Sequence, residues 1–246
     1  MTTVTRADRR LAVRIGLGLA ATVGLGVPFL LLALLVRSRW DPLIDLDTRV
    51  AEGMHSVAVR HHWLVDLMQD VSFVLGPFVL RPLVTVLALV LLARRRVRLG
   101  SWVLVTLWGG ALLGVVLKSV VGRARPDLVD AVATEGGRSF PSGHALGGTI
   151  AVGLLALVLA PLLPPAARLA ARLAAVLAVL LVCFARVTLG VHYLSDVTAG
   201  VLLGIGWLAV TAAAFEAWRR DVGLPPSEPE EVSPELADGE PEPAGP

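Results

Sequence analysis

Three short segments of the sequence hold the residue types that could do chemistry together. In chain order their members are Lys118 and Arg125, then Ser142, Gly143 and His144, then Arg186, His192 and Asp196. Arginine and lysine side chains bind phosphate oxygens, and backbone N–H groups at a helix N-terminus bind anions as well. Because Ser142 and Gly143 directly precede an apolar run, the set predicts an anion site suited to phosphate.

Two histidines and an aspartate would make this anion site reactive. His192 and Asp196 are four residues apart, a spacing that places both side chains on one face of a helix. The carboxylate could then accept from one ring nitrogen and leave the other free to attack phosphorus. His144, in a different segment, could protonate the leaving oxygen. The pattern favours phosphoryl transfer through a phosphohistidine, with cations stabilising the charge and no metal or other cofactor.

Each of these signals has a structural explanation when it is taken alone. A lysine at the end of an apolar helix often extends its amine toward water, and His–Asp pairs in helices are often structural. Lys118, however, is the only lysine among the 22 lysine and arginine residues of the chain. The joint occurrence of this lysine with two arginines, two histidines and a paired aspartate favours the functional explanation.

The elements that must position these residues are membrane helices. Hydrophobic residues make up 55% of the 246 residues and charged residues 17%, against about a quarter in soluble domains. A span needs about 20 apolar residues, and six segments come close to or reach that length: 15–36, 71–93, 99–117, 145–163, 169–184 and 197–215. We expect an all-α domain of six transmembrane helices over 1–220, with an interfacial helical segment at 37–70. Residues 221–246, rich in acids and prolines, predict a disordered tail.

Arginine clusters indicate the orientation in the plasma membrane. Cytoplasmic loops carry an excess of basic residues, and the cluster at 94–98 together with those near both chain ends favours cytoplasmic termini. All three reactive segments then emerge on the extracytoplasmic face. The basic surplus is thereby assigned to membrane topology, and no nucleic-acid partner is expected.

Three further arginines have two explanations each. Arg123 and Arg138 would contact a second phosphate of a pyrophosphate substrate, or they would face lipid headgroups and solvent. Arg81 stands beside Pro82 inside the segment 71–93. It is either a buried functional cation or, as the sequence slightly favours, a residue near an interface because the span starts later.

No metal site is expected. His55, His61 and His62 are interpreted as solvated or interfacial side chains, because no acid at a helical spacing completes a ligand set. The single cysteine, Cys183, excludes an intramolecular disulfide and a cysteine zinc cluster.

The three segments resemble the three-part signature of the type-2 phosphatidic acid phosphatase family of membrane lipid phosphatases. The matching residues are Lys118, Arg125 and Pro126, then Pro141, Ser142, Gly143 and His144, then Arg186, His192 and Asp196. The resemblance covers about residues 70–215 and implies a six-helix bundle with metal-independent hydrolysis at the outer face. It implies His192 as nucleophile, His144 as general acid and Asp196 as the residue that orients His192, with phosphate ligands Lys118, Arg125, Ser142, Gly143 and Arg186. Ala185 stands where the family usually has serine, which predicts the loss of one hydrogen bond worth about 1 kcal/mol.

The expected partner is a lipid phosphate held in the membrane. Candidates are a polyprenyl pyrophosphate such as undecaprenyl pyrophosphate, phosphatidylglycerol phosphate and phosphatidic acid, with the first slightly favoured because that carrier is dephosphorylated on the outer side. The alternative is a non-hydrolytic phospholipid-binding or transport protein, against which the intact His192, His144 and Asp196 argue. A vanadium-dependent haloperoxidase shares such an anion pocket, but six spans argue against it. The sequence leaves open whether the chain forms a homo-oligomer.

Overall fold

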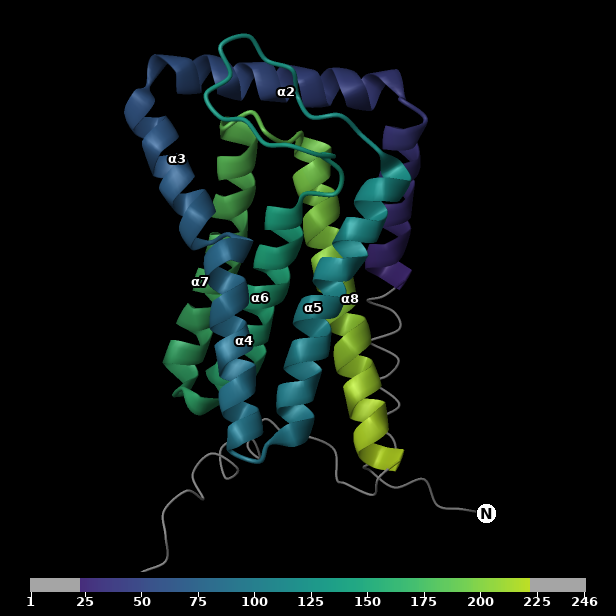
Figure 1. Cartoon of the computed structure of the whole chain (residues 1–246), viewed down its shortest axis with the longest axis vertical. Helices are drawn as coiled ribbons and strands as arrows, with labels where there is room; N and C mark the ends of the chain where they lie inside the picture. Colours follow the sequence, from purple (N-terminus) through teal and green to yellow (C-terminus); the bar gives the residue numbers. More distant parts are fainter. Residues whose placement is uncertain (1–22, 222–246) are drawn as a thin grey trace, which may run out of the picture.

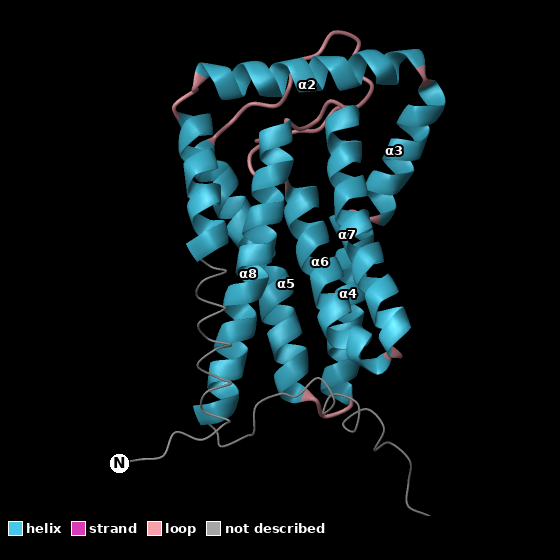
Figure 2. Ribbon diagram, turned by 180° about the vertical axis from the view of Figure 1, so that it is seen from behind, coloured by secondary structure: helices cyan, strands magenta, loops and turns pink. Residues whose placement is uncertain are grey.

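The computed structural model describes residues 23–221, which form helices and connecting loops without a strand (Figures 1 and 2). This confirms the expected all-α class for the described part of the chain. The helices in chain order are Val23–Arg37, α2 (Asp41–Arg60), α3 (His62–Val74), α4 (Pro77–Ala93), α5 (Val97–Val121), α6 (Gly143–Leu159), the short 3₁₀ turn η1 (Ala160–Leu162), α7 (Pro165–Thr188) and α8 (Leu194–Asp221).

Four segments of the described chain are long and apolar enough to cross a membrane: His62–Ala93, Val97–Val121, Pro165–Thr188 and Leu194–Glu216. A fifth is reached if Val23–Arg37 and α2, which meet at 90°, count as one broken span. α6 is apolar but only 17 residues long, because prolines at 161, 164 and 165 stop it. Six spans therefore stay a prediction, and the start of the first expected span and the tail 222–246 lie outside the described residues.

The segment 37–70 is only in part the surface element expected from the sequence. α2 lies across one end of the bundle, whereas α3 turns down along the bundle and packs against α7 (Figure 1). The expected interfacial assignment is therefore wrong for residues 62–70, which open the candidate span His62–Ala93. The sequence places the start of that span at residue 71, because the exposed Asp66 and Asp70 lower the hydropathy of the residues before it.

The candidate span is interrupted between α3 and α4, at Leu75 and Gly76. A Cβ atom at Gly76 would lie 2.2 Å from the carbonyl oxygen of Ser72 and 3.1 Å from the ring of His144. Only glycine allows this close approach. The break therefore gives room to a histidine that comes from a different helix.

α6 is the central helix and packs against α4, α5, α7 and α8. Its closest neighbour is α8, where a Cβ at Gly200 would lie 2.8 Å from the carbonyl oxygen of Ser142 and one at Gly204 would lie 2.8 Å from Thr149. Small residues allow membrane helices to approach in this way. As a result the N-terminal ends of α6 and α8 meet, and the backbone N–H of Ser142 donates to the Asp196 carbonyl at 3.0 Å.

The loop 122–142, the start of α6 and the turn before α8 all lie at the end of the bundle that α2 covers (Figure 1). The turn with Arg94–Arg96 lies at the opposite end (Figure 1). The structure thus brings the three reactive segments to one end, as the sequence predicts.

Candidate active site

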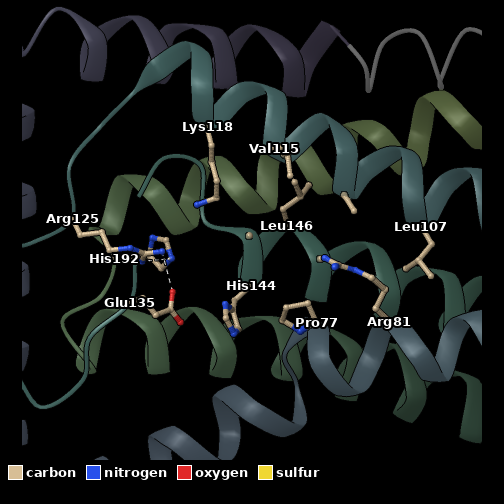
Figure 3. A pocket seen from close by; sticks show the side chains of 14 residues that line it. Pro77, Arg81, Leu107, Val115, Lys118, Arg125, Glu135, His144, Leu146 and His192 are labelled. Carbon is tan, nitrogen blue, oxygen red and sulfur yellow. Dashed lines mark hydrogen bonds and ion pairs between the residues drawn. The ribbon is translucent and has the colours of Figure 1, made fainter. Parts of the chain in front are cut away.

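A cavity of about 230 Å³ lies between α4, α5 and α6 and is bordered at one end by the loop 122–142 (Figure 3). At that end its wall is polar and comes from four elements: Lys118, Arg125, Glu135, His144 and His192. The remaining wall is mostly apolar or glycine, with Arg81 as its one charged member among the described residues. The cavity therefore joins a charged end to an apolar depth, the shape that a lipid with an anionic headgroup requires.

His192 lies in the turn between α7 and α8, and its side chain is 1% exposed. Its Nε2 is 3.2 Å from Nη1 of Arg125. Because a guanidinium can only donate, Nε2 must be the acceptor, and the ring proton of the neutral histidine resides on Nδ1. The nitrogen that carries the lone pair, Nε2, is thus the one beside Arg125.

Asp196 faces the other ring nitrogen of His192. Its Oδ2 is 3.4 Å from Nδ1, which is close but longer than an ordinary hydrogen bond. The expectation that one helix carries both residues is wrong, because α8 begins at Leu194 and His192 precedes it. The pairing nevertheless forms, because the first turn of α8 folds Asp196 back under the ring.

The burial of His192 sets its protonation state. Burial lowers the pKa of His192 to about 4, although Asp196 acts in the opposite direction, and Arg186 and Arg125 lower it further. The imidazole is therefore neutral at pH 7 and keeps its lone pair.

Arg123 holds Asp196 in place from behind. Its Nη1 donates to Oδ1 of Asp196 at 2.8 Å, its Nη2 donates to Oδ2 of Asp47 at 2.7 Å, and its guanidinium carbon lies 4.0 Å from the ring centroid of Tyr193. The side chain is 9% exposed. Both sequence explanations of Arg123, a second-phosphate ligand and a solvent- or headgroup-facing residue, are therefore wrong.

Asp47 is a residue of this network that the sequence reasoning missed. It is fully buried on α2, and besides Arg123 it accepts from the backbone N–H of Ser195 at 2.9 Å and from the Ser195 hydroxyl. One signal could have found it: α2 buries Asp47, Ala51, His55 and Ala58 on one stripe, and a carboxylate on an otherwise inward-facing stripe needs a buried partner. α2 thus supports the N-terminal end of α8, where Ser195 and Asp196 lie.

Arg186 lies in the last turn of α7 and is 4% exposed. Its Nη1 donates to the hydroxyl of Ser72 at 2.8 Å, and its Nη2 forms an ion pair with Glu135. Glu135 also pairs with Arg125, with 3.0 Å between Oε2 and Nη2. The Glu135 carboxylate thus pairs with both of the arginines that were expected to bind phosphate, Arg125 and Arg186. Figure 3 shows it between Arg125 and His144.

Glu135 was not anticipated, because the loop 122–142 has no periodicity that would place a side chain. Burial alone would raise the pKa of Glu135, but Arg186, with His144 and Arg125, holds that pKa below its ordinary value. The carboxylate is therefore ionised at neutral pH and is an internal anion between Arg125 and Arg186.

Lys118, Gly143 and His144 complete the charged end, while Ser142 does not face it. Lys118 donates to the carbonyl of Arg138 at 2.6 Å, and its Cε would be 3.8 Å from a Cβ at Gly143. Gly143 and His144 begin α6, so their N–H groups have no intrahelical acceptor. Ser142 is fully buried, and its Oγ accepts from the N–H of Ala145 at 3.4 Å, which caps the helix.

Two further residues that the sequence singled out, Arg138 and Ala185, are not part of the cavity wall. Arg138 donates to the carbonyl of Gly122 at 2.7 Å. Ala185 is fully buried in an apolar cluster with Ala58 and Met68, so the position of the missing serine does not border the cavity.

The three histidines of α2 and α3 separate in the structure. His61 and His62 are exposed, whereas His55 is buried and its Nε2 lies 2.7 Å from the carbonyl of Val129, a contact that fastens the loop 122–142. The interpretation of His55 as solvated or interfacial is therefore wrong. Within residues 23–221 no group of three or more His, Cys, Asp or Glu side chains is arranged to hold a metal ion.

The fold and the site together define a class: a helical protein of membrane type that places cations and a histidine–aspartate pair around one cavity. Comparison with known proteins agrees with this class. The model of the PAP2 superfamily matches residues 99–220. The chain is 30% identical over 185 residues to phosphatidylglycerophosphatase B of Bacillus subtilis strain 168, which covers 74% of this chain and 89% of the relative.

Two further matches have the same character. An undecaprenyl-diphosphatase of Sulfolobus acidocaldarius is 29% identical over 141 residues, 54% of this chain and 63% of the relative. The crystal structure of a transmembrane PAP2-type phosphatidylglycerolphosphate phosphatase from Bacillus subtilis superposes with a TM-score of 0.72 at 25% identity, covering 82% of this chain and 98% of the other. The chain therefore belongs to the PAP2 superfamily and is a hydrolase of phosphoric esters, of the lipid phosphatase class.

Proposed function

We propose that the protein hydrolyses the terminal phosphate of a membrane lipid through a phosphohistidine on His192, without a metal ion. The observation that supports this most is the contact between Nε2 of His192 and Nη1 of Arg125 at 3.2 Å. It directs the lone pair of a neutral, buried imidazole to the place where a cation would bind the reacting phosphate.

The proposed reaction has two steps. The phosphate binds to Lys118, Arg125 and Arg186 and displaces the Glu135 carboxylate from the two arginines. Nε2 of His192 attacks phosphorus and the bond to the leaving oxygen breaks. His144, which takes up a proton when the phosphate anion binds beside it, donates that proton to the leaving oxygen. Water then attacks the phosphorus, the P–N bond breaks, and the neutral His144 accepts a proton from the water as inorganic phosphate leaves.

The electrostatics of the charged end suit an anionic substrate. Lys118 and Arg125 line that end, and Arg186, which pairs with the lining residue Glu135, is a third cation next to it. Three cations and one carboxylate leave a formal charge of +2 before the substrate binds. Preorganised donors of this kind stabilise the charge that develops on the transferring phosphoryl group. We propose that this end lies on the extracytoplasmic face of the plasma membrane and that both termini are cytoplasmic, because the Arg94–Arg98 cluster lies at the other end.

The substrate class follows from the cavity and the relatives. The apolar depth suits a lipid, and the matched relatives are named for phosphatidylglycerol phosphate and undecaprenyl diphosphate. These two lipids and phosphatidic acid are therefore the substrates to compare.

The experiment uses the full chain purified in detergent with EDTA present. Phosphate release from the three lipids is followed for the wild type, for His192→Ala and for Arg138→Gln, whose exposed side chain is not part of the cavity wall. We expect release by the wild type and by Arg138→Gln, and none by His192→Ala. Release that persists in His192→Ala would contradict the phosphohistidine, and folded wild-type protein that releases nothing would favour the binding or transport alternative.

A further inference from the structure

Arg81 is a cation in the apolar depth of the cavity that the proposed chemistry does not use. It lies on α4, inside the candidate span His62–Ala93. The sequence slightly favoured a late start of this span, with Arg81 near an interface; the span starts earlier instead, and Arg81 lies well inside it. Its guanidinium carbon is 5.6 Å from the ring centroid of Trp108 on α5.

The guanidinium of Arg81 has no anionic partner within residues 23–221. Its side chain makes no hydrogen bond or ion pair with another described residue, and the Trp108 ring supplies only a cation–π contact. A cation held inside a membrane span without a counterion is costly. Figure 3 shows Arg81 directed into the same cavity as His144, and an anion that enters this cavity would supply what the structure lacks.

The distance between Arg81 and the charged end of the cavity can be estimated along α6. A Cβ at Gly143 would lie 3.8 Å from Cε of Lys118, and a Cβ at Gly147 would lie 3.9 Å from Nη2 of Arg81. These two glycines are four residues apart on one helix, which corresponds to a rise of about 6 Å. The two cations therefore lie about one helical turn apart beside a wall that carries no side chains at either point.

We infer that Arg81 binds a second phosphate of the lipid substrate, and that the preferred substrate carries a phosphomonoester joined through a glycerol-length bridge to a phosphodiester. This inference rests on the proposed function and specifies its substrate. Three carbons and two oxygens separate the phosphorus atoms of such a lipid and span about one helical turn.

The other two candidate substrates do not fit this spacing. A pyrophosphate joins its phosphorus atoms through a single oxygen, so both remain at the Lys118 end. Phosphatidic acid has no second phosphate. The apolar wall near Arg81, with Leu107 and Val115, is where the acyl chains of the bridged lipid would follow its phosphodiester.

The test compares Arg81→Leu with Arg81→Lys in the full chain in detergent. Arg172→Leu is the matched control, because Arg172 is an exposed cation on α7 that is remote from the cavity wall. Values of kcat and KM are measured with phosphatidylglycerol phosphate, phosphatidic acid and undecaprenyl pyrophosphate.

We expect Arg81→Leu to lower kcat/KM for phosphatidylglycerol phosphate by about 10- to 100-fold, mainly through KM, since a charge-assisted contact is lost. The same variant should change the other two substrates by less than about threefold, which also shows that it folds. Arg81→Lys should retain most of the preference, and Arg172→Leu all of it.

Two results would overturn the inference: an equal loss with all three substrates, or no loss with phosphatidylglycerol phosphate. A wild type that hydrolyses the other two lipids but not phosphatidylglycerol phosphate would overturn it as well and leave the phosphatase function intact. Activity that survives in His192→Ala would instead contradict the proposed function itself.

Discussion

Arg123 and Arg125 leave the same loop two residues apart and enter two regions of opposite character. The rear network, Asp47, Arg123, Ser195 and Asp196, contains two carboxylates for one arginine, and every charge in it has a close partner. The front cluster, Lys118, Arg125, Glu135 and Arg186, contains three cations for one carboxylate.

The difference shows how one loop can both stabilise the structure around the site and supply a cation to it. The rear network is closed to solvent and saturated, so its contribution is to stability and to the position of Asp196. The front cluster keeps an excess of positive charge, so its contribution becomes complete only with an anion. Residue type alone distinguishes neither role, because both regions use the same guanidinium group.

The largest effect is expected in the rear network, from Arg123→Gln. The change leaves Asp47 and Asp196 buried without their cation, and breaking a buried ion pair costs about 3–5 kcal/mol. We expect a large fall in the melting temperature in detergent. Arg138→Gln, on the exposed side of the same loop, is the control and should melt like the wild type; equal melting of the two variants would refute the structural role of Arg123.

A smaller effect, on turnover rather than on stability, is expected from Arg125→Gln in the front cluster. The variant loses the donor to Nε2 of His192 and a phosphate ligand, which should lower kcat/KM by about 100-fold. Its melting temperature should change much less than that of Arg123→Gln. The contrast between the two regions would break down if Arg125→Gln proved as unstable as Arg123→Gln.

The protonation of His192 sharpens the contrast further. Its pKa is lowered to about 4, so the ring stays neutral as the pH falls through the ordinary histidine range and becomes charged only near pH 4. NMR of ¹⁵N-histidine-labelled protein, with the signal assigned by loss in His192→Gln, should show no titration between pH 8 and pH 5. A midpoint near 6.5 would show that the ring is far less buried than the structure has it.

The smallest effect is expected from Glu135→Gln. The amide keeps the shape but removes the negative charge that competes with phosphate for Arg125 and Arg186. Inhibition by inorganic phosphate should therefore tighten by a few-fold, about 1 kcal/mol. Weaker inhibition would mean that Glu135 acts mainly by positioning the two arginines.

The sequence was sufficient to predict the all-helical class, the family and the gathering of the reactive segments at one end. The spacing of the motifs allowed this prediction, because Lys118, His144 and His192 each lie within or directly beside the end of an apolar helix. It could not predict the partner of Asp47, because Ser195 is 148 residues away, or the position of Glu135, which lies in an aperiodic loop. The start of the second span was misplaced for a physical reason: exposed Asp66 and Asp70 lower the local hydropathy of a helix that nevertheless continues into the bundle.

The phosphohistidine itself can be trapped by removing the residue that is proposed to activate water. In His144→Ala, a substrate with a good leaving group such as p-nitrophenyl phosphate needs no general acid for the first step, while the second step is slowed. Rapid quenching followed by mass spectrometry should show an acid-labile, base-stable phosphate on the peptide that carries His192, and no such species in His192→Ala. Continued phosphate release without any label on His192, or a label on another residue, would contradict the mechanism proposed for this protein.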